Sequence, residues 1–226
     1  AYDKTFTNLR FRLSASVYSN PNIQRNTMYA GDRTGSHYFL MMERAVQANG
    51  TATTAAAQFT SGRFNPQMSN RVTAIMVNPF IKFKGLELFG SYETVSGGLY
   101  SDTLMVGGKA SWEKRSFNQI SGEVLYRFLP GEQAYVGARY VTVTGEPDGN
   151  AFKNADGSRI KVNMNRLAVA GGWFPTKNLL LKGEYVIQNF GDAGSAGFEK
   201  DKDFPVNDYR YKGKFSGFFV QAVVGF

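Results

Sequence analysis

The chain has 226 residues, 25 of them glycine and 15% aromatic, with no cysteine, which is enough for one β-domain and excludes disulfides and thiol catalysis. The mean hydropathy of −0.31 and the lack of any run of about 18 apolar residues exclude a transmembrane helix. A net charge of +8 is typical of nucleic-acid-binding proteins, but the Lys and Arg residues are scattered singly along the chain, so we expect no nucleic-acid partner.

Eight segments alternate apolar residues with polar or small ones, which is the period of a β-strand with one apolar face. In chain order the apolar faces cover residues 9–17, 75–83, 86–92, 120–128, 136–142, 167–173, 179–187 and 218–226. Because a barrel strand shows only every second residue to lipid, this pattern predicts an all-β, antiparallel transmembrane β-barrel. An apolar island at residues 37–43 leaves two alternatives open, an extra hairpin that would give ten strands or a plug inside the lumen.

The predicted connections alternate between tight turns and long polar stretches. Gly, Pro and Asn mark tight turns at residues 84–85, 130–132 and 175–178, whereas long loops cover about 19–70, 96–116, 145–159 and 191–214. Short periplasmic turns and long extracellular loops are typical of outer-membrane barrels. We therefore predict one barrel domain over residues 1–226, integral to the bacterial outer membrane, with an even strand count that places both chain ends on the periplasmic side. Pro79, inside the second segment, predicts a bulge.

Aromatic residues recur near the ends of the predicted strands, where an amphipathic ring suits the membrane interface. We expect an aromatic girdle made by Tyr126, Tyr140, Trp173, Tyr185 and Phe226. The last segment ends on Phe226, and terminal Phe strands of this kind resemble the signal read by the machinery that assembles outer-membrane barrels. The surroundings that we predict are outer-membrane lipid and lipopolysaccharide.

The residues that alternate with the lipid-facing ones point inward and carry most of the charge. The predicted lumen-lining bases are Arg10, Arg12, Lys82, Lys84, Arg127, Arg139, Arg166 and Lys182. The predicted lumen-lining acids are Glu87, Glu93, Glu123 and Glu184. A charge on the lipid face costs about 2–4 kcal/mol near the midplane, so we expect this partition to be enforced. An excess of bases on low-dielectric walls raises the local concentration of anions, which predicts a weakly anion-favouring channel for small anionic or neutral solutes.

An alternative interpretation of the inward charges stays open. In an eight-stranded barrel the lumen is narrow, and such side chains fill it as a salt-bridged polar core. Pairs of Glu123 with Arg127 or Arg139, and of Lys182 with Glu184, would belong to a core of that type.

The sequence offers little for catalysis or for a cofactor. His37 is the only imidazole, which leaves no histidine cluster for a metal, and Ser36 stands next to it in sequence, which rarely gives a catalytic triad. We predict that the protein is not an enzyme and has no catalytic residue, no metal site and no cofactor.

Several stretches together resemble the Gram-negative outer-membrane porins related to the phosphate-selective type. They are residues 9–13, 28–36, 78–90, 126–128, 171–174 and 182–185 and the terminal Phe strand. The resemblance implies passive diffusion of small solutes through a pore of roughly 16–18 strands, often with a loop folded into the channel. This chain has about half of the expected length and resembles the C-terminal half, so it is either part of a larger barrel or a compact relative.

The function that we predict is a porin-like outer-membrane channel for passive diffusion. The alternative is a non-conducting barrel subunit that serves as a structural element or binds a partner through its long loops. A homo-oligomer or a larger membrane complex is compatible with both functions.

Overall fold

The computed structural model describes residues 1–23, 26–30, 40–41, 50–54, 56, 61–99, 103–106, 109–148, 153–191 and 213–225. His37, most of the apolar island 37–43 and Phe226 lie outside the described residues, so the expectations for them stay predictions. No described helix is long and apolar enough to be a candidate membrane span.

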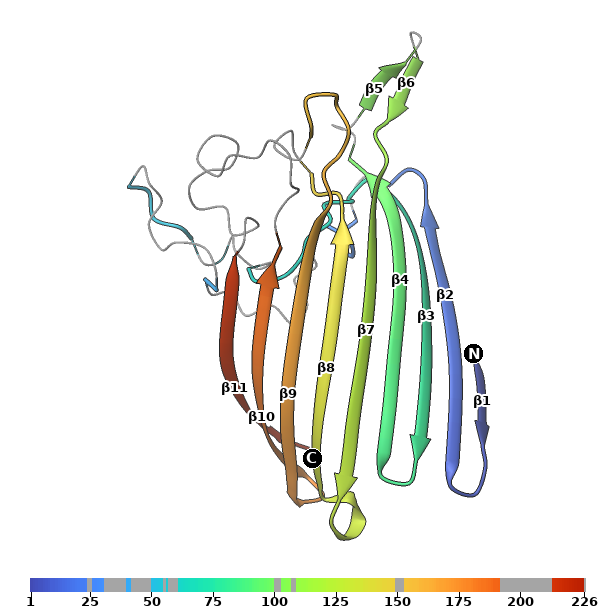
Figure 1. The fold of residues 1–226 in the computed structure, drawn as a ribbon, viewed down its shortest axis with the longest axis vertical. Helices are drawn as coiled ribbons and strands as arrows, with labels where there is room; N and C mark the ends of the chain where they lie inside the picture. The colour runs from blue at the N-terminus through green and yellow to red at the C-terminus, as the bar shows by residue number, and fades with distance from the viewer. Residues whose placement is uncertain are drawn as a thin grey trace.

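The described strands form one antiparallel sheet and a separate hairpin (Figure 1). The sheet contains β1 (Tyr2–Thr5), β2 (Leu9–Asn20), β3 (Arg71–Phe83), β4 (Leu86–Gly98), β7 (Arg115–Phe128), β8 (Ala134–Gly145), β9 (Val162–Thr176), β10 (Leu179–Phe190) and β11 (Lys214–Val224). Each strand pairs with its neighbour in the chain order, so the sheet is a meander of nine strands. The hairpin of β5 (Thr103–Val106) and β6 (Lys109–Trp112) lies in the connection between β4 and β7.

The eight predicted segments correspond to β2, β3, β4 and β7–β11, so the antiparallel all-β prediction is confirmed. The predicted count of eight is wrong for the main sheet, because β1 adds a ninth strand, and the even count fails with it. The expected loop 96–116 also contains the β5–β6 hairpin. β1, β5 and β6 have four residues each, which is too few to show an alternating pattern in the sequence. β1 and β11 stand at the two ends of the sheet order, so the described strands form an open sheet.

The tight turns gather at one end of the sheet and the long connections at the other (Figure 1). We call these the turn end and the loop end. Lys84, with a φ of 50°, and Gly131, with a φ of 70°, take the left-handed conformations that their turns require. The third turn is shorter than expected, because Pro175 belongs to β9 and only residues 177–178 separate β9 from β10.

Pro79 lies inside β3 without the bulge that the sequence predicts. Val77 pairs with Tyr92 and Phe80 pairs with Phe89, so the register to β4 is the same on both sides of the proline. The residue opposite Pro79 in this register is Gly90, where a Cβ would come within 3.0 Å of the proline Cγ. The missing side chain of the glycine therefore makes room for the ring, and no extra residue is needed.

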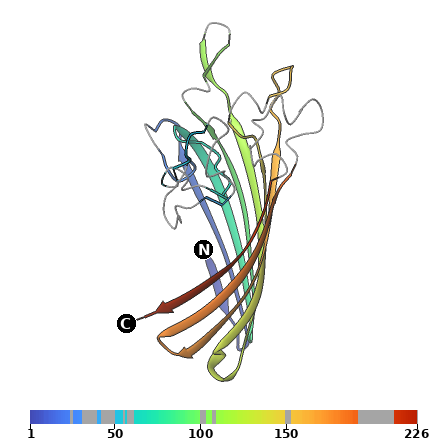
Figure 2. The same cartoon turned by 90° about the vertical axis from the view of Figure 1, so that its left-hand side faces the viewer.

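The sheet is strongly curved, and the described parts of the long β2–β3 connection lie on its concave side (Figure 2). The buried core forms there, between the loop end of the concave face and the described parts of that connection. Its residues are Met68, Val72, Ala74, Val95, Phe117, Val143, Met164 and Phe190. The curvature and the core together define two different faces, a convex apolar one and a concave polar one, that carry the candidate site.

Candidate functional site

The convex face carries every lipid-facing residue that the sequence predicts within the described strands. Registers across the sheet place them in continuous rows, for example Leu88, Val124, Ala138 and Val169. Charges on this face of the main sheet, within the described strands, are limited to Lys4, Arg71 and Lys214 near strand ends.

Four of the five predicted girdle residues are described, and all four lie half-exposed on the convex face. Tyr126 and Trp173 lie near the turn end, whereas Tyr140 and Tyr185 lie farther toward the loop end. The Tyr140 hydroxyl donates to Asn165 Oδ1 at 3.2 Å, so its polar tip meets the polar residues that follow. In β7 the apolar stretch from Ile120 to Phe128 is ~26 Å long at ~3.3 Å per residue, which is comparable to the apolar band of an outer-membrane barrel.

The concave face carries the predicted lumen-lining charges, which the register places on one side of the sheet. They are Arg10, Arg12, Lys82, Glu87, Glu93, Glu123, Arg127, Arg139, Arg166, Lys182 and Glu184. Lys84 is the one exception, because it lies in the turn between β3 and β4 and its ammonium group sits 5.5 Å from the centre of the Phe83 ring.

A network of ion pairs lies at the turn end of the concave face. Glu87 Oε1 accepts from Lys82 Nζ at 3.1 Å and from Arg127 Nε at 3.0 Å. Lys82 also reaches Glu132, in the β7–β8 turn, at 3.1 Å. Glu87 is half-buried, so this network ties three neighbouring strands together and leaves little of its charge available to a solute.

Farther along the same face the pairing is looser. Arg139 Nε donates to Glu123 at 2.6 Å, which confirms one of the two predicted partners of Glu123. Glu184 lies 4.0 Å from Arg166, not beside Lys182 as expected. Lys182 makes no ion pair with any described residue, so the middle of the face keeps an excess of positive charge.

Two adjoining hollows run along the concave face over β7–β10. The larger, of 370 Å³, is bounded by residues 62–64 of the β2–β3 connection and by Arg139, Arg166 and Glu184. The smaller, of 150 Å³, continues toward the turn end and shares Arg139, Ala168 and Glu184 with the first. Small residues make the space, because Gly137, Ala168 and Ala170 face the hollows where larger side chains would fill them.

The β2–β3 connection is fixed across the loop end of the concave face by polar contacts. Arg115 of β7, fully buried, donates to the carbonyls of Pro66 at 2.6 Å and Gln67 at 2.8 Å. Gln188 of β10 donates to the carbonyl of Gly62 at 2.7 Å. Residues 62–67 are therefore held at both ends of a span that crosses from β7 to β10.

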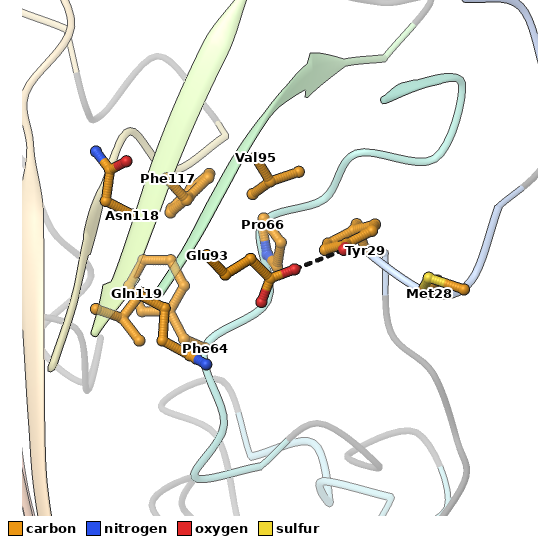
Figure 3. A pocket seen from close by; sticks show the side chains of 10 residues that line it. Met28, Tyr29, Phe64, Pro66, Glu93, Val95, Phe117, Asn118 and Gln119 are labelled. Carbon is orange, nitrogen blue, oxygen red and sulfur yellow. Dashed lines mark hydrogen bonds between the residues drawn. The ribbon is translucent and has the colours of Figure 1, made fainter. Parts of the chain in front are cut away.

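A third contact fixes the connection nearer to β4 (Figure 3). Tyr29 donates from its hydroxyl to Glu93 Oε1 at 2.5 Å. Burial, together with the hydrogen bond and the charge of Glu93, raises the pKa of Tyr29 well above its ordinary value, so the phenol stays a neutral donor. Phe64 packs edge-on against Phe117 with 5.0 Å between the ring centres, which adds an apolar contact to the polar ones.

The β8–β9 connection is fixed on the outer side of the loop end. Glu113 accepts from Arg159 at 2.7 Å and from Lys153 at 2.8 Å. Burial opposes ionisation of Glu113, but these two cations outweigh it and hold the pKa of the carboxyl below its ordinary value. The acid is therefore charged at neutral pH and stabilises the connection.

Sequence reasoning missed the residues that hold the connection, although a signal for them is present. Near the loop end the alternation reverses, so that Val143 and Met164 face the concave side while Thr144 and Asn163 face the convex side. Such a change of phase predicts an apolar cover on the inner face and a polar rim on the outer one. Comparisons with protein-family models, with curated proteins and with solved structures found no match for this chain.

Proposed function

We propose that this chain forms wall strands of an outer-membrane β-barrel. The barrel acts as a porin-like channel for passive diffusion of small hydrophilic solutes, with a weak preference for anions. The observation that carries the proposal is the pairing of an apolar convex face with a hollowed, charged concave face. The two hollows are lined by four basic residues, Arg63, Arg139, Arg166 and Lys182, and by two acids, Glu123 and Glu184. A wall of this kind attracts anions and is stable only with lipid outside and water inside.

The proposal also covers the closure of the barrel. An open sheet leaves unpaired backbone groups at both edges, which cannot face hydrocarbon, so β1, β2 and β11 must pair with further strands or with each other in the membrane. The resemblance to porins with roughly 16–18 strands favours further strands. The intact mass of the protein extracted from membranes tests this, because a mass near twice 25.0 kDa means that this chain is part of the wall.

Planar-bilayer conductance with reversal potentials tests the channel. We expect discrete channel events and a weak anion preference, reduced in the double variant Arg139→Gln with Arg166→Gln, because the change removes two charges from the hollows. Arg71→Gln, on the convex face, removes the same type of charge and serves as the matched control. No channel events, or a clear cation preference in the unmodified protein, contradicts the proposal.

A second function is favoured by the apolar cluster around Met68 and Phe117. These residues fill the concave side at the loop end, as a barrel that does not conduct would require. In that case the protein is a structural or partner-binding barrel subunit whose long connections meet another protein. A stoichiometric partner in purified native membranes, together with no conductance, would favour this function over the channel.

A further inference from the structure

Two aromatic side chains on neighbouring strands lie together on the concave face. Phe80 of β3 and Phe89 of β4 stand directly opposite each other in the turn half of the sheet, next to the row that carries Lys82 and Glu87. Phe89 is 41% exposed, and neither residue belongs to the buried core at the loop end. Phe80 is half-buried, so the pair is only partly exposed, and it lies outside the apolar core that packs this sheet.

A guanidinium group flanks this pair. Arg12 of β2 stands opposite Phe80, so Arg12, Phe80 and Phe89 form one row across three strands. The neighbouring Arg10 is neutralised by Asp3, to which it donates at 3.0 and 2.6 Å. Asp3 also stands opposite Arg12 in the β1–β2 register, but both of its carboxylate oxygens accept from Arg10. Arg12 itself makes no ion pair with any described residue, so its charge is available to an anion.

The row lies in a hollow of 620 Å³ that is separate from the two described above. Its lining also includes Ser14 and Asn78, which supply a hydroxyl and an amide next to the guanidinium. This volume lies within the range of about 300–1,000 Å³ that is typical of small-molecule sites, which combine an apolar wall with a few polar groups.

We propose that this hollow binds aromatic carboxylates, with the carboxylate on Arg12 and the ring against Phe80 and Phe89. A guanidinium pairs with a carboxylate through two parallel hydrogen bonds. The ring of the ligand can stack on the two phenylalanine rings or meet them edge-to-face. The site rests on the proposed function in one respect, since it needs the concave face to be filled with water.

The test is binding of 4-fluorobenzoate, followed by ¹⁹F NMR on the protein in lipid nanodiscs, with empty nanodiscs to subtract partition into lipid. We expect saturable binding that benzoate displaces and acetate does not. Arg12→Gln weakens binding about tenfold through loss of a charged hydrogen bond. Phe89→Leu weakens it about threefold to tenfold through loss of the aromatic contact. Arg71→Gln, an arginine on the convex face, leaves it unchanged.

Displacement by acetate as readily as by benzoate overturns the proposal, and so does unchanged binding in Arg12→Gln. The displacement arm uses only the unmodified protein, so it decides the matter even where a variant fails to fold. Saturable benzoate binding without conductance contradicts the channel alone, whereas anion-selective conductance without such binding contradicts this site alone.

Discussion

At the scale of single residues, the structure explains how a proline is tolerated inside a β-strand that is paired on both sides. Pro79 removes one backbone donor from β3, and its ring projects toward the neighbouring strand β4. Gly90 stands opposite and has no side chain to collide with that ring. The pairing of the two residues keeps the register of β3 and β4 in phase from end to end.

Replacing Gly90 by Val should therefore destabilise the sheet by about 1–3 kcal/mol through overpacking against Pro79. Gly122 is the matched control, because it pairs with Gly90 on the next strand and a Cβ there meets nothing within 4 Å. Urea unfolding of the protein from lipid vesicles measures both variants. Equal unfolding midpoints for Gly90→Val and Gly122→Val would show that Pro79 places no demand on its partner.

At the scale of elements, the β2–β3 connection behaves as part of the sheet. It crosses the loop end of the concave face, where three strands donate or accept hydrogen bonds to it. Arg115 is the central contact, since its charge is fully buried and it donates to two backbone carbonyls of the connection. A buried donor that loses its acceptors is costly, so the arginine and the connection fix each other.

Arg115→Met should release residues 61–70 from the sheet, at a cost of about 1–3 kcal/mol for the lost hydrogen bonds. The amide of Met68, which donates to the carbonyl of Tyr29 at 2.8 Å, should then exchange faster with deuterium. Lys114→Met changes the exposed neighbour in the same way and should leave this exchange as it is. Slow exchange at Met68 in both variants would mean that other contacts hold the connection.

The β8–β9 connection should be sensitive to acid through Glu113. The pKa of Glu113 is lowered by folding, so the ion pairs with Arg159 and Lys153 stabilise fully above the ordinary value of 4.5. This stabilisation is lost as the pH falls through the lowered pKa of the folded state. Hydrogen exchange of residues 153–161 between pH 3 and pH 7 measures it. In the Glu113→Gln variant, residues 153–161 should exchange faster at neutral pH than in the unmodified protein and should lose most of this pH dependence. An unchanged exchange profile in the variant would contradict this role of Glu113.

At the scale of the whole molecule, the sheet has two faces of opposite chemical character. Its convex face is apolar from the turn end to the middle and polar beyond, while its concave face is charged and then apolar under the connection. A water-soluble sheet with this convex face would leave a large apolar surface exposed, which soluble proteins avoid. The proposed barrel buries that surface in lipid.

A charge introduced on each face in turn tests whether the convex face meets lipid and the concave face meets water. Val124→Arg, on the convex face near mid-strand, should cost about 2–4 kcal/mol in a bilayer. Ser121→Arg, on the concave face of the same strand, should cost less than about 1 kcal/mol if that face is wet. Urea unfolding from lipid vesicles measures both, and equal costs for the two variants would contradict the membrane orientation of the sheet.

The sequence by itself determined the strands and their faces. Alternation with period two is a local property, so it located β2, β3, β4 and β7–β11 and assigned Val124 and Glu123 to opposite faces. It failed in β1, where the strand is too short to show a pattern. It also failed at Pro79, where the steric fit to the neighbouring strand determines whether a bulge forms.

The tertiary structure alone decided which charges meet and what covers the concave face. Glu87 joins Lys82 and Arg127 because the register of three strands brings them together, and no spacing along the chain encodes that meeting. The same holds for the row of Arg12, Phe80 and Phe89. Hydrogen-bond register and the path of a long connection depend on contacts between distant residues, so local pattern fixes the faces of the strands but not the partners on them.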